Sequence, residues 1–336
     1  MLRGIATLSA IMLFASAAYA DPVGAEPVKL RVGGVAPSAD LVELMFAKQG
    51  VARHLGQSYD YAPMHMAGTP PVITAIATGD LDIGVFSYSS FGLAIENAKM
   101  TDLRVIFDEF QDGAPGYYTG EFKVLKDGPI RAIEDMKGHV AASPGAGSAL
   151  DIAIRAMMKK HGMEDKRDYT IVEAALPNLK SMLLSKKVDL AAAGTTAITD
   201  PDLQAQTRNL FTQVEAVSRT EMIMLAAREG FLEKNRAAVT DFLEDALRAR
   251  HFYFDPANHK EAVAIVSQFT KQPADQLDPW LFTRHDYYRD PNGVPDASAL
   301  QGSVDLLKRL GFLKTEIEAR RYVDLSYVQA AAARLK

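Results

Sequence analysis

The chain has 336 residues, of which 48% are hydrophobic and 24% are charged. A globular domain typically holds ~100–200 residues, so the length predicts two lobes, each with a sizeable core. The net charge of −5 and the lack of a long basic run argue against a nucleic-acid-binding surface. The sequence contains no cysteine, which excludes disulfides, thiolate metal sites, iron–sulfur clusters and cysteine nucleophiles.

Residues 1–20 have the layout of a cleavable secretory signal peptide. Arg3 supplies a positive charge, an apolar run covers 5–18, and Ala18-Tyr19-Ala20 places small residues where signal peptidase reads them. The run is shorter than the ~20 residues that a membrane-spanning helix needs. A buried N-terminal helix is the alternative. Because no cysteine stands at the cleavage site to carry a lipid anchor, we expect a soluble exported protein, most simply a periplasmic one.

The first half of the mature chain alternates strand and helix signals. Strands are predicted at 28–32, 83–86 and 103–107. A helix with an apolar face is predicted over 41–51, and a second one starts at Thr69, which can cap a helix whose first turn holds two prolines.

The second half repeats this order. A strand at 139–142 leads into a loop of small residues, 143–148, and then into a helix. The segment 185–190 matches 78–83, since both run from a helix end through a turn and an Asp into an apolar strand. After a further strand at 222–226 the chain reads as helical. Two α/β lobes of similar construction are therefore predicted.

Open α/β sheets bind ligands beyond the carboxyl ends of their strands. The loops at those ends are rich in small and hydroxyl residues, and three of them open helices whose free N–H groups suit a small anion or a carbonyl. One helix end contributes only ~0.3–1 kcal/mol, whereas micromolar affinity needs about 8 kcal/mol, so several ends must converge. The alternative is that these residues merely cap helices. The loops are 37–40, 68–69, 87–90, 145–148 and 194–196.

Motifs for catalysis or cofactor binding are weak or missing. Gly145-Ala146-Gly147 begins like a dinucleotide fingerprint, but Leu150 stands at the third glycine position. The sequence has no phosphate-binding P-loop and no nucleophile elbow, and its seven histidines lack metal-ligand spacing. His285 is the most tempting single histidine, although a structural role is commoner. We expect no catalytic residue, metal or cofactor.

Aromatic and charged side chains flank the predicted strand ends. Tyr88, Phe110 and Tyr117 follow strands and could stack on a ligand, with packing in the core as the alternative. The acids near the site argue against a doubly charged anion unless bases offset them, and solvated surface charge is the default for both. The acids are Asp40, Glu109 and Asp112, and the bases are Lys180, Arg219 and Arg284.

Four motifs, in their order and spacing, give the chain a family resemblance. They are Gly68-Thr69-Pro70-Pro71 with the following 75–82, Met136–Ala141, Leu183–Asp189 and Val323–Val328. With the export signal and the strand-first α/β order, they resemble the nitrate/sulfonate/taurine-type solute-binding proteins of ABC importers over nearly the whole mature chain.

The resemblance implies an α/β, two-lobed periplasmic-binding-protein fold of type II, with the ligand cleft between the lobes and two crossing strands as the hinge. The first lobe would comprise 28–114 and 222–336, including the C-terminal helices, and the second 115–221. The partners implied are a small-molecule ligand and ABC permease subunits in the inner membrane, and we expect a monomer.

The resemblance also places ligand contacts on the strand-end loops. No arginine lies in those loops, so the charge of the ligand stays open, as does the question whether Arg219 or Arg284 reaches the cleft. Joined with the aromatic and loop candidates above, the predicted ligand-binding residues are Ser38, Asp40, Gly68, Thr69, Ser87, Tyr88, Ser89, Phe110, Gly147, Ser148, Asn178 and Thr195.

The expected function is capture of a small organic solute, sulfonate- or carboxylate-like or aromatic, for import. Two other classes remain: an exported lyase or hydrolase on the same fold, and a ligand-responsive partner of a sensor system. The thiamine-pyrimidine synthases that share the fold depend on a cysteine-rich segment, which this sequence lacks. The menaquinone-pathway enzymes on this fold would lack the signal peptide.

Overall fold

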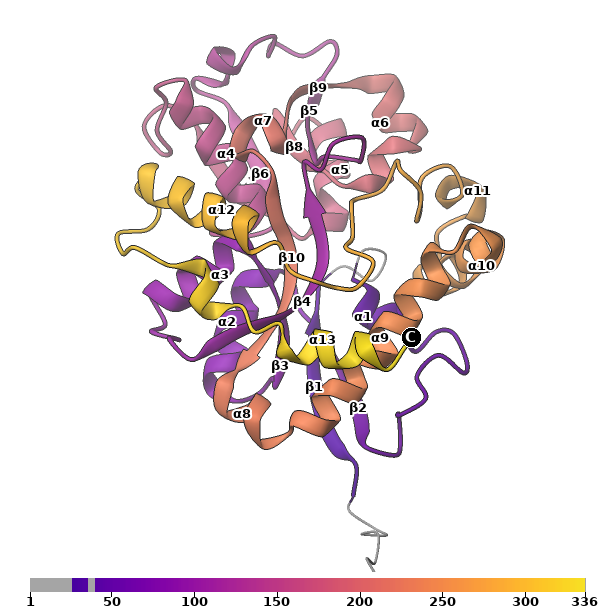
Figure 1. Ribbon diagram of the computed structural model, residues 1–336. Helices are drawn as coiled ribbons and strands as arrows, with labels where there is room; N and C mark the ends of the chain where they lie inside the picture. Colours follow the sequence, from indigo (N-terminus) through magenta and orange to yellow (C-terminus); the bar gives the residue numbers. More distant parts are fainter. Residues whose placement is uncertain (1–25, 36–39, 336) are drawn as a thin grey trace, which may run out of the picture.

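The computed structural model describes residues 26–35 and 40–335, except the side chains of 196 and 197 (Figure 1). The predicted signal peptide, 1–20, and the candidate ligand residue Ser38 lie outside the described residues. None of the described helices is long and apolar enough to cross a membrane.

The first lobe is built on a five-stranded mixed sheet with the order β2-β1-β3-β10-β4. β1 pairs in parallel with β2 and β3, whereas β10 runs antiparallel to β3 and β4. The strands are β1 (Val28–Gly34), β2 (Tyr59–His65), β3 (Ile83–Ser87), β4 (Leu103–Asp112) and β10 (Thr220–Arg228).

Three helices follow the parallel strands of this sheet: α1 (Leu41–Leu44), α2 (Thr69–Thr78) and α3 (Tyr88–Glu96). α2 begins at Thr69, as the sequence predicts, and has proline in its first turn. The predicted capping role of Thr69 is wrong, because Gly68 is the N-cap and no described side chain caps the helix. α1 is shorter than predicted, because the chain leaves the helix after Leu44 and continues as turns toward β2.

The second lobe is built on another five-stranded sheet, of order β7-β6-β8-β5-β9. β6 pairs in parallel with β7 and β8, and β5 runs antiparallel to β8 and β9. The strands are β5 (Glu121–Leu125), β6 (Val140–Ser143), β7 (Thr170–Glu173), β8 (Leu190–Ala193) and β9 (Thr207–Thr212). The helices are η1 (Ile133–Met136), α4 (Ala149–Lys160), α5 (Leu176–Leu184), η2 (Thr195–Ile198), α6 (Pro201–Gln206) and α7 (Gln213–Val217).

The chain crosses between the two sheets twice, from β4 to β5 and from β9 through α7 to β10. Both lobes place parallel strands, each followed by a helix, beside antiparallel crossing strands. The predicted α/β two-lobed fold is confirmed.

The C-terminal third is helical and packs mostly on the first lobe, where α9 contacts α13, α1 and β2 (Figure 1). α12 contacts β10 and α3. The elements are α8 (Glu229–Lys234), α9 (Arg236–Phe254), η3 (Pro256–Asn258), α10 (His259–Thr270), α11 (Ala274–Leu277), α12 (Ala297–Arg309), η4 (Ala319–Tyr322) and α13 (Ser326–Ala333).

An irregular segment, 281–294, runs back from α11 toward α12 and lies along β4; we call it the C-terminal strap (Figure 1). Main-chain hydrogen bonds fix it: Gln111 N donates to Tyr288 O at 2.8 Å, and Asp108 N donates to Gly293 O at 2.9 Å. Gly293 has φ +66°, and a Cβ there would lie 2.3 Å from the Phe107 ring, so only glycine lets the strap approach β4 this closely.

A buried ion pair locks α9, β4 and the strap together. Arg250 Nη1 lies 3.0 Å from Asp108 Oδ2, and both side chains are buried. The same nitrogen donates to Asp290 O at 2.6 Å, and the guanidinium lies over the Phe107 ring at 4.5 Å. Asp108 Oδ2 also accepts from Asp290 N at 2.9 Å. The two charges are thus paired and hydrogen-bonded, as burial requires.

Replacing Arg250 by Met should lower the free energy of unfolding by ~3–5 kcal/mol, because Asp108 would stay buried without its cation. Chemical denaturation measures the loss. Arg236→Met, at the exposed start of the same helix, is the control: it removes a surface hydrogen bond to Ser326 and a ring contact with Tyr327, and should cost only about 1 kcal/mol. Equal losses in the two variants would contradict the assigned role. If Arg250→Met does not fold, Arg250→Lys, which keeps the charge without the planar fork, should still be clearly destabilised.

Candidate functional site

Hydroxyl side chains form a chain at the start of α2 and α3 in the first lobe. Thr69 Oγ1 lies 3.2 Å from Ser87 Oγ, which lies 2.9 Å from Ser89 Oγ. Ser87 also caps α3 by accepting from Ser90 N at 3.1 Å. All these side chains are buried. The C-terminal ends of the first lobe's parallel strands therefore present aligned hydroxyl groups at two helix starts.

This hydroxyl chain continues onto the second lobe. Ser89 Oγ donates to Gly147 O at 2.8 Å, and Tyr88 OH donates to Ala149 O at 3.2 Å. Gly147 has φ +81°, and a Cβ there would meet Leu93 Cδ1 at 2.6 Å. Any other residue here would be strained by this left-handed backbone conformation, and the Leu93 side chain would have to move. The two lobes are in direct contact here.

The loop of the second lobe is braced from its own helix. Ser148 caps α4 by accepting from Asp151 N at 3.3 Å, and Asp151 Oδ2 accepts from Gly147 N at 2.9 Å. Gly68, at the start of α2, faces this loop, since a Cβ on it would lie 3.9 Å from Pro144 O. Three helix N-termini from two lobes thus meet at one place, which we call the helix-start cluster (Gly68, Thr69, Ser87, Tyr88, Ser89, Gly147 and Ser148).

The remaining predicted residues in the described part of the chain lie outside this cluster. Asp40 is buried at the start of α1 and accepts from Val35 N at 2.7 Å. Phe110 is buried and stacks on Tyr287 of the strap at 4.5 Å. Thr195 is buried at the start of η2. Asn178 is exposed near the start of α5, and no described contact joins it to the other predicted residues.

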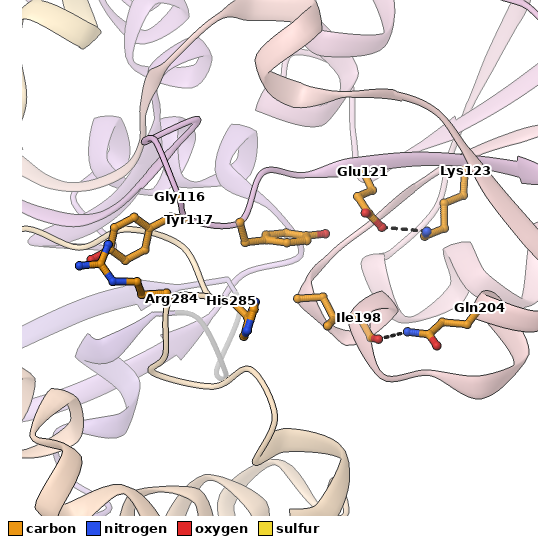
Figure 2. A pocket seen from close by; sticks show the side chains of 9 residues that line it. Gly116, Tyr117, Glu121, Lys123, Ile198, Gln204, Arg284 and His285 are labelled. Carbon is orange, nitrogen blue, oxygen red and sulfur yellow. Dashed lines mark hydrogen bonds and ion pairs between the residues drawn. The ribbon is translucent and has the colours of Figure 1, made fainter.

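A pocket of about 370 Å³ opens between the second lobe and the strap (Figure 2). Its walls come from the turn before β5, from β5 itself, from η2 and α6, and from the strap. It contains none of the twelve predicted residues, but Tyr117, Arg284 and His285 stood out in the sequence. The lining residues are Gly116, Tyr117, Tyr118, Glu121, Lys123, Ile198, Gln204, Arg284 and His285.

Sequence reasoning missed the part of the pocket wall on β5 and α6. Lys123 Nζ lies 2.8 Å from Glu121 Oε2 and donates to Asn209 Oδ1 at 2.7 Å, while Gln204 donates to Ile198 O (Figure 2). β5 pairs with β8 and β9, which lie about 70 to 90 residues further along the chain. No local sequence motif therefore predicts this strand.

Arg284 and Arg219 line two different cavities. Arg284 lines the pocket of Figure 2, with its guanidinium 5.3 Å from the Tyr117 ring centre. Arg219 lines a second cavity of about 380 Å³ beside α12, where it pairs with Asp296 at 3.0 Å and donates to Gln111 Oε1 at 2.6 Å. Lys180 is paired with Asp200 at 2.7 Å.

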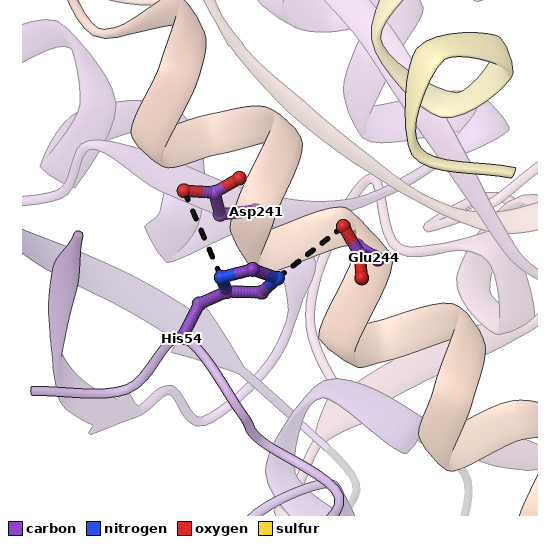
Figure 3. A group of neighbouring side chains, drawn as sticks. All are labelled: His54, Asp241 and Glu244. Carbon is purple, nitrogen blue, oxygen red and sulfur yellow. Dashed lines mark ion pairs between the residues drawn. The ribbon is translucent and has the colours of Figure 1, made fainter. Parts of the chain in front are cut away.

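A third group consists of His54, Asp241 and Glu244, whose ligand-type atoms lie within 4.8 Å of one another (Figure 3). The imidazole lies between the carboxylates, with Nε2 3.3 Å from Glu244. Arg334 Nη1 lies 2.5 Å from Asp241, and Arg248 pairs with Glu244, so cations already neutralise both acids. The group fastens α13 and the loop before β2 to α9, and we assign it this structural role.

Buried carboxylates surround the start of α1. Glu109 accepts from Leu41 N at 3.0 Å and from Val42 N at 3.3 Å. Burial raises the pKa of Glu109 to about 8 against the opposing charge of Arg250. Burial and the Asp40 carboxylate raise the pKa of Glu43 to about 7. The two hydrogen bonds to Glu109 hold the start of α1 against β4.

A comparison with known families decides the relationship of the chain. Residues 64–258 match the family model described as NMT1/THI5 like. The chain belongs to the NMT1/THI5-like family. The resemblance to solute-binding proteins of the nitrate/sulfonate/taurine type is thereby confirmed at the level of family and fold.

Solved structures share the fold of this NMT1/THI5-like chain. The alkanesulfonate-binding protein SsuA from Xanthomonas axonopodis pv. citri, bound to MOPS, has a TM-score of 0.71 at 16% identity, over 90% of this chain and 100% of that chain. The nitrate-binding protein NrtA from Synechocystis PCC 6803 has a TM-score of 0.71 at 14% identity, over 93% of this chain and 90% of that chain.

The desulfurization enzyme DSZB has a TM-score of 0.62 at 12% identity, over 92% of this chain and 100% of that chain. A search of curated proteins found no match. At these identities the solved structures establish the fold of the NMT1/THI5-like chain, which binding proteins and an enzyme share.

The raised pKa of Glu109 predicts that its contribution to stability is lost with rising pH. The folded state keeps this proton up to about pH 8, whereas an unfolded Glu releases it near ~4.3. The contribution is therefore complete below pH ~4.3 and is lost as the pH rises through 8. Between pH 5 and 8.5, the drop in unfolding free energy should be smaller in Glu109→Gln than in the native protein, by an amount on the order of a few kcal/mol.

Chemical denaturation across this pH range measures the difference. Glu318→Gln, the same substitution at an exposed position, is the matched control. Parallel profiles for the native protein and Glu109→Gln would show that Glu109 is ionised in the folded state.

Proposed function

We propose that the protein is the substrate-binding component of an ABC importer, which captures a small organic solute between its lobes and delivers it to a membrane permease. The observation that carries this proposal is the helix-start cluster, where helix N-termini from both lobes meet and Ser89 Oγ bonds Gly147 O at 2.8 Å. Membership of the NMT1/THI5-like family and the two-lobed fold support it.

The cluster fits the capture of a polar ligand in a closing cleft. N–H groups and hydroxyls at helix starts donate to anions and carbonyls, and each helix end contributes ~0.3–1 kcal/mol when exposed. Enclosure between two lobes excludes water and adds donors from both sides, which the ~8 kcal/mol of a micromolar complex requires. A ligand would insert between α3 and the loop before α4 and replace the Ser89–Gly147 contact.

The lobes proposed to close comprise 28–114 with 222–336, and 115–221, with the two strand crossings between them as the hinge. We propose export through the cleavable signal peptide 1–20 into the periplasm, without a lipid anchor. There the monomer would meet the inner-membrane permease. The solute proposed is sulfonate- or carboxylate-like, or aromatic.

We also propose that the ligand leaves unchanged, without a cofactor. At the cluster, the hydroxyl oxygens of Ser87 and Ser148 accept hydrogen bonds as helix caps. This role favours ligand binding over nucleophilic chemistry. An exported lyase or hydrolase is the second candidate, because the fold is shared with the desulfurization enzyme DSZB. Turnover of a bound ligand by the purified protein would decide for the enzyme.

A thermal-shift screen of small sulfonates, carboxylates, nitrate, pyrimidines and aromatic acids, followed by calorimetry, tests the site. We expect one ligand per monomer. The double variant Thr69→Ala/Ser148→Ala should bind at least ~10-fold more weakly, since it removes a hydroxyl from each lobe at a cost of ~1.4 kcal/mol or more.

The control is Thr78→Ala/Ser185→Ala, which removes exposed hydroxyls from the C-terminal ends of α2 and α5 and should leave the affinity unchanged. Undiminished affinity in Thr69→Ala/Ser148→Ala, or a stoichiometry other than one, would contradict the placement of the site. Unfolding curves of both variants separate lost binding from lost folding.

A further inference from the structure

We propose that Arg284 of the C-terminal strap recognises the charged group of the solute proposed above, and that the lining around Arg284 favours a single negative charge. This inference rests on the proposed function and extends its site to the pocket of Figure 2. The pocket volume of about 370 Å³ suits a small organic molecule.

The pocket adjoins two residues that the sequence places in the site. Tyr118 OH donates to Ala193 O at 3.1 Å, at the end of β8 and just before Thr195. The Tyr118 ring packs edge-on against Tyr287 at 5.0 Å, and Tyr287 stacks on Phe110 at 4.5 Å. A ligand in this pocket would therefore touch second-lobe residues and the strap together, and hinge motion would alter its walls.

The charge balance of the pocket points to one negative charge. Lys123 and Glu121 neutralise each other at 2.8 Å. The Arg284 guanidinium has no carboxylate within ion-pairing distance in the described part of the chain, and it lies over the Tyr117 ring. Lys123, Glu121 and Arg284 together give the lining a net charge of about +1. A planar guanidinium donates two parallel N–H groups, which match a carboxylate or sulfonate.

The backbone that carries Arg284 is fixed before any ligand arrives. Buried Asp286 accepts from Phe282 N at 3.1 Å and from Tyr287 N at 2.7 Å, and Tyr118 N donates to Asp286 O at 3.0 Å. His285 N donates to Thr283 Oγ1 at 3.0 Å. This turn is held on both sides of Arg284, so binding does not have to order it.

Flat and apolar surfaces beside the guanidinium suit the body of the ligand. The Tyr117 ring packs edge-on against Tyr288 at 5.1 Å, and Ile198 supplies an aliphatic patch on the opposite wall (Figure 2). An aromatic monoanion could place its charged group at Arg284 and its ring among these side chains.

Calorimetry with matched probes tests the proposal. The probes are benzenesulfonate and benzoate as monoanions, benzenesulfonamide and benzamide as neutral counterparts, and phthalate as a dianion. We expect the monoanions to bind most tightly and Arg284→Gln to weaken them at least ~10-fold, with a smaller loss in Arg284→Lys. The affinity of both Arg284 variants for the neutral probes should equal that of the native protein. Arg219→Gln, in the second cavity, is the control and should bind like the native protein.

Two results would overturn the proposal. One is that no monoanion binds better than its neutral counterpart, and the other is that Arg284→Gln binds benzenesulfonate or benzoate as the native protein does. If either result is found while the binding affinity of a ligand still depends on Thr69 and Ser148, the proposed function stands and only the role of Arg284 is contradicted. A protein whose ligand affinity depends on neither Arg284 nor the helix-start cluster would contradict both.

Discussion

A guanidinium buried against a carboxylate is the contact around which the C-terminal part of the molecule is arranged. Burying either charge alone would cost several kcal/mol, so the pair persists only because each partner finds further hydrogen bonds. Arg250 of α9 reaches Asp108 on β4 at 3.0 Å, and both groups also bond the main chain of Asp290. One interaction therefore joins a helix, the edge strand β4 and the strap, and the strap carries Arg284 toward the second lobe.

Other buried acids lie along the same edge of the first lobe. Burial and the neighbouring Asp108 carboxylate raise the pKa of Glu221 well above its usual range, and burial raises that of Asp112 to about 6. Asp112 accepts from Thr119 Oγ1 and Gly120 N at the crossing from β4 to β5. Polar groups withdrawn from water at a crossing favour one defined geometry, because each must keep its partner.

The sequence predicts the features of this protein that depend on local order. Strand, loop and capped helix recur in both halves, so the α/β lobes and the meeting of Thr69, Ser87 and Ser148 at strand ends follow from pattern alone. The sequence does not predict β2, because Pro63 and polar residues interrupt its pattern. An edge strand can contain proline and polar residues, and β2 lies at the edge of its sheet. The wall on β5, the strap and the His54 group arise from contacts far apart in sequence, which no motif or spacing records.

The lack of cysteine excludes thiol chemistry, and the length predicts two lobes. The positions of the charged side chains around the pocket, however, come from the fold. The sequence offers several arginines and does not distinguish Arg284 from the others. The strap places Arg284 in the pocket wall, whereas Arg219 is paired with Asp296. The proposed site therefore has two parts: the helix starts, which any small polar ligand could use, and a wall of the C-terminal segment, where Arg284 would select for charge.

A crystal structure of the protein with the tightest ligand from the screen would show directly where the ligand binds. We expect one ligand enclosed between the lobes, with its polar end at the helix starts or Arg284 and its body against the strap. A ligand bound on the outer surface of a single lobe, with the Ser89–Gly147 contact unchanged, would contradict it.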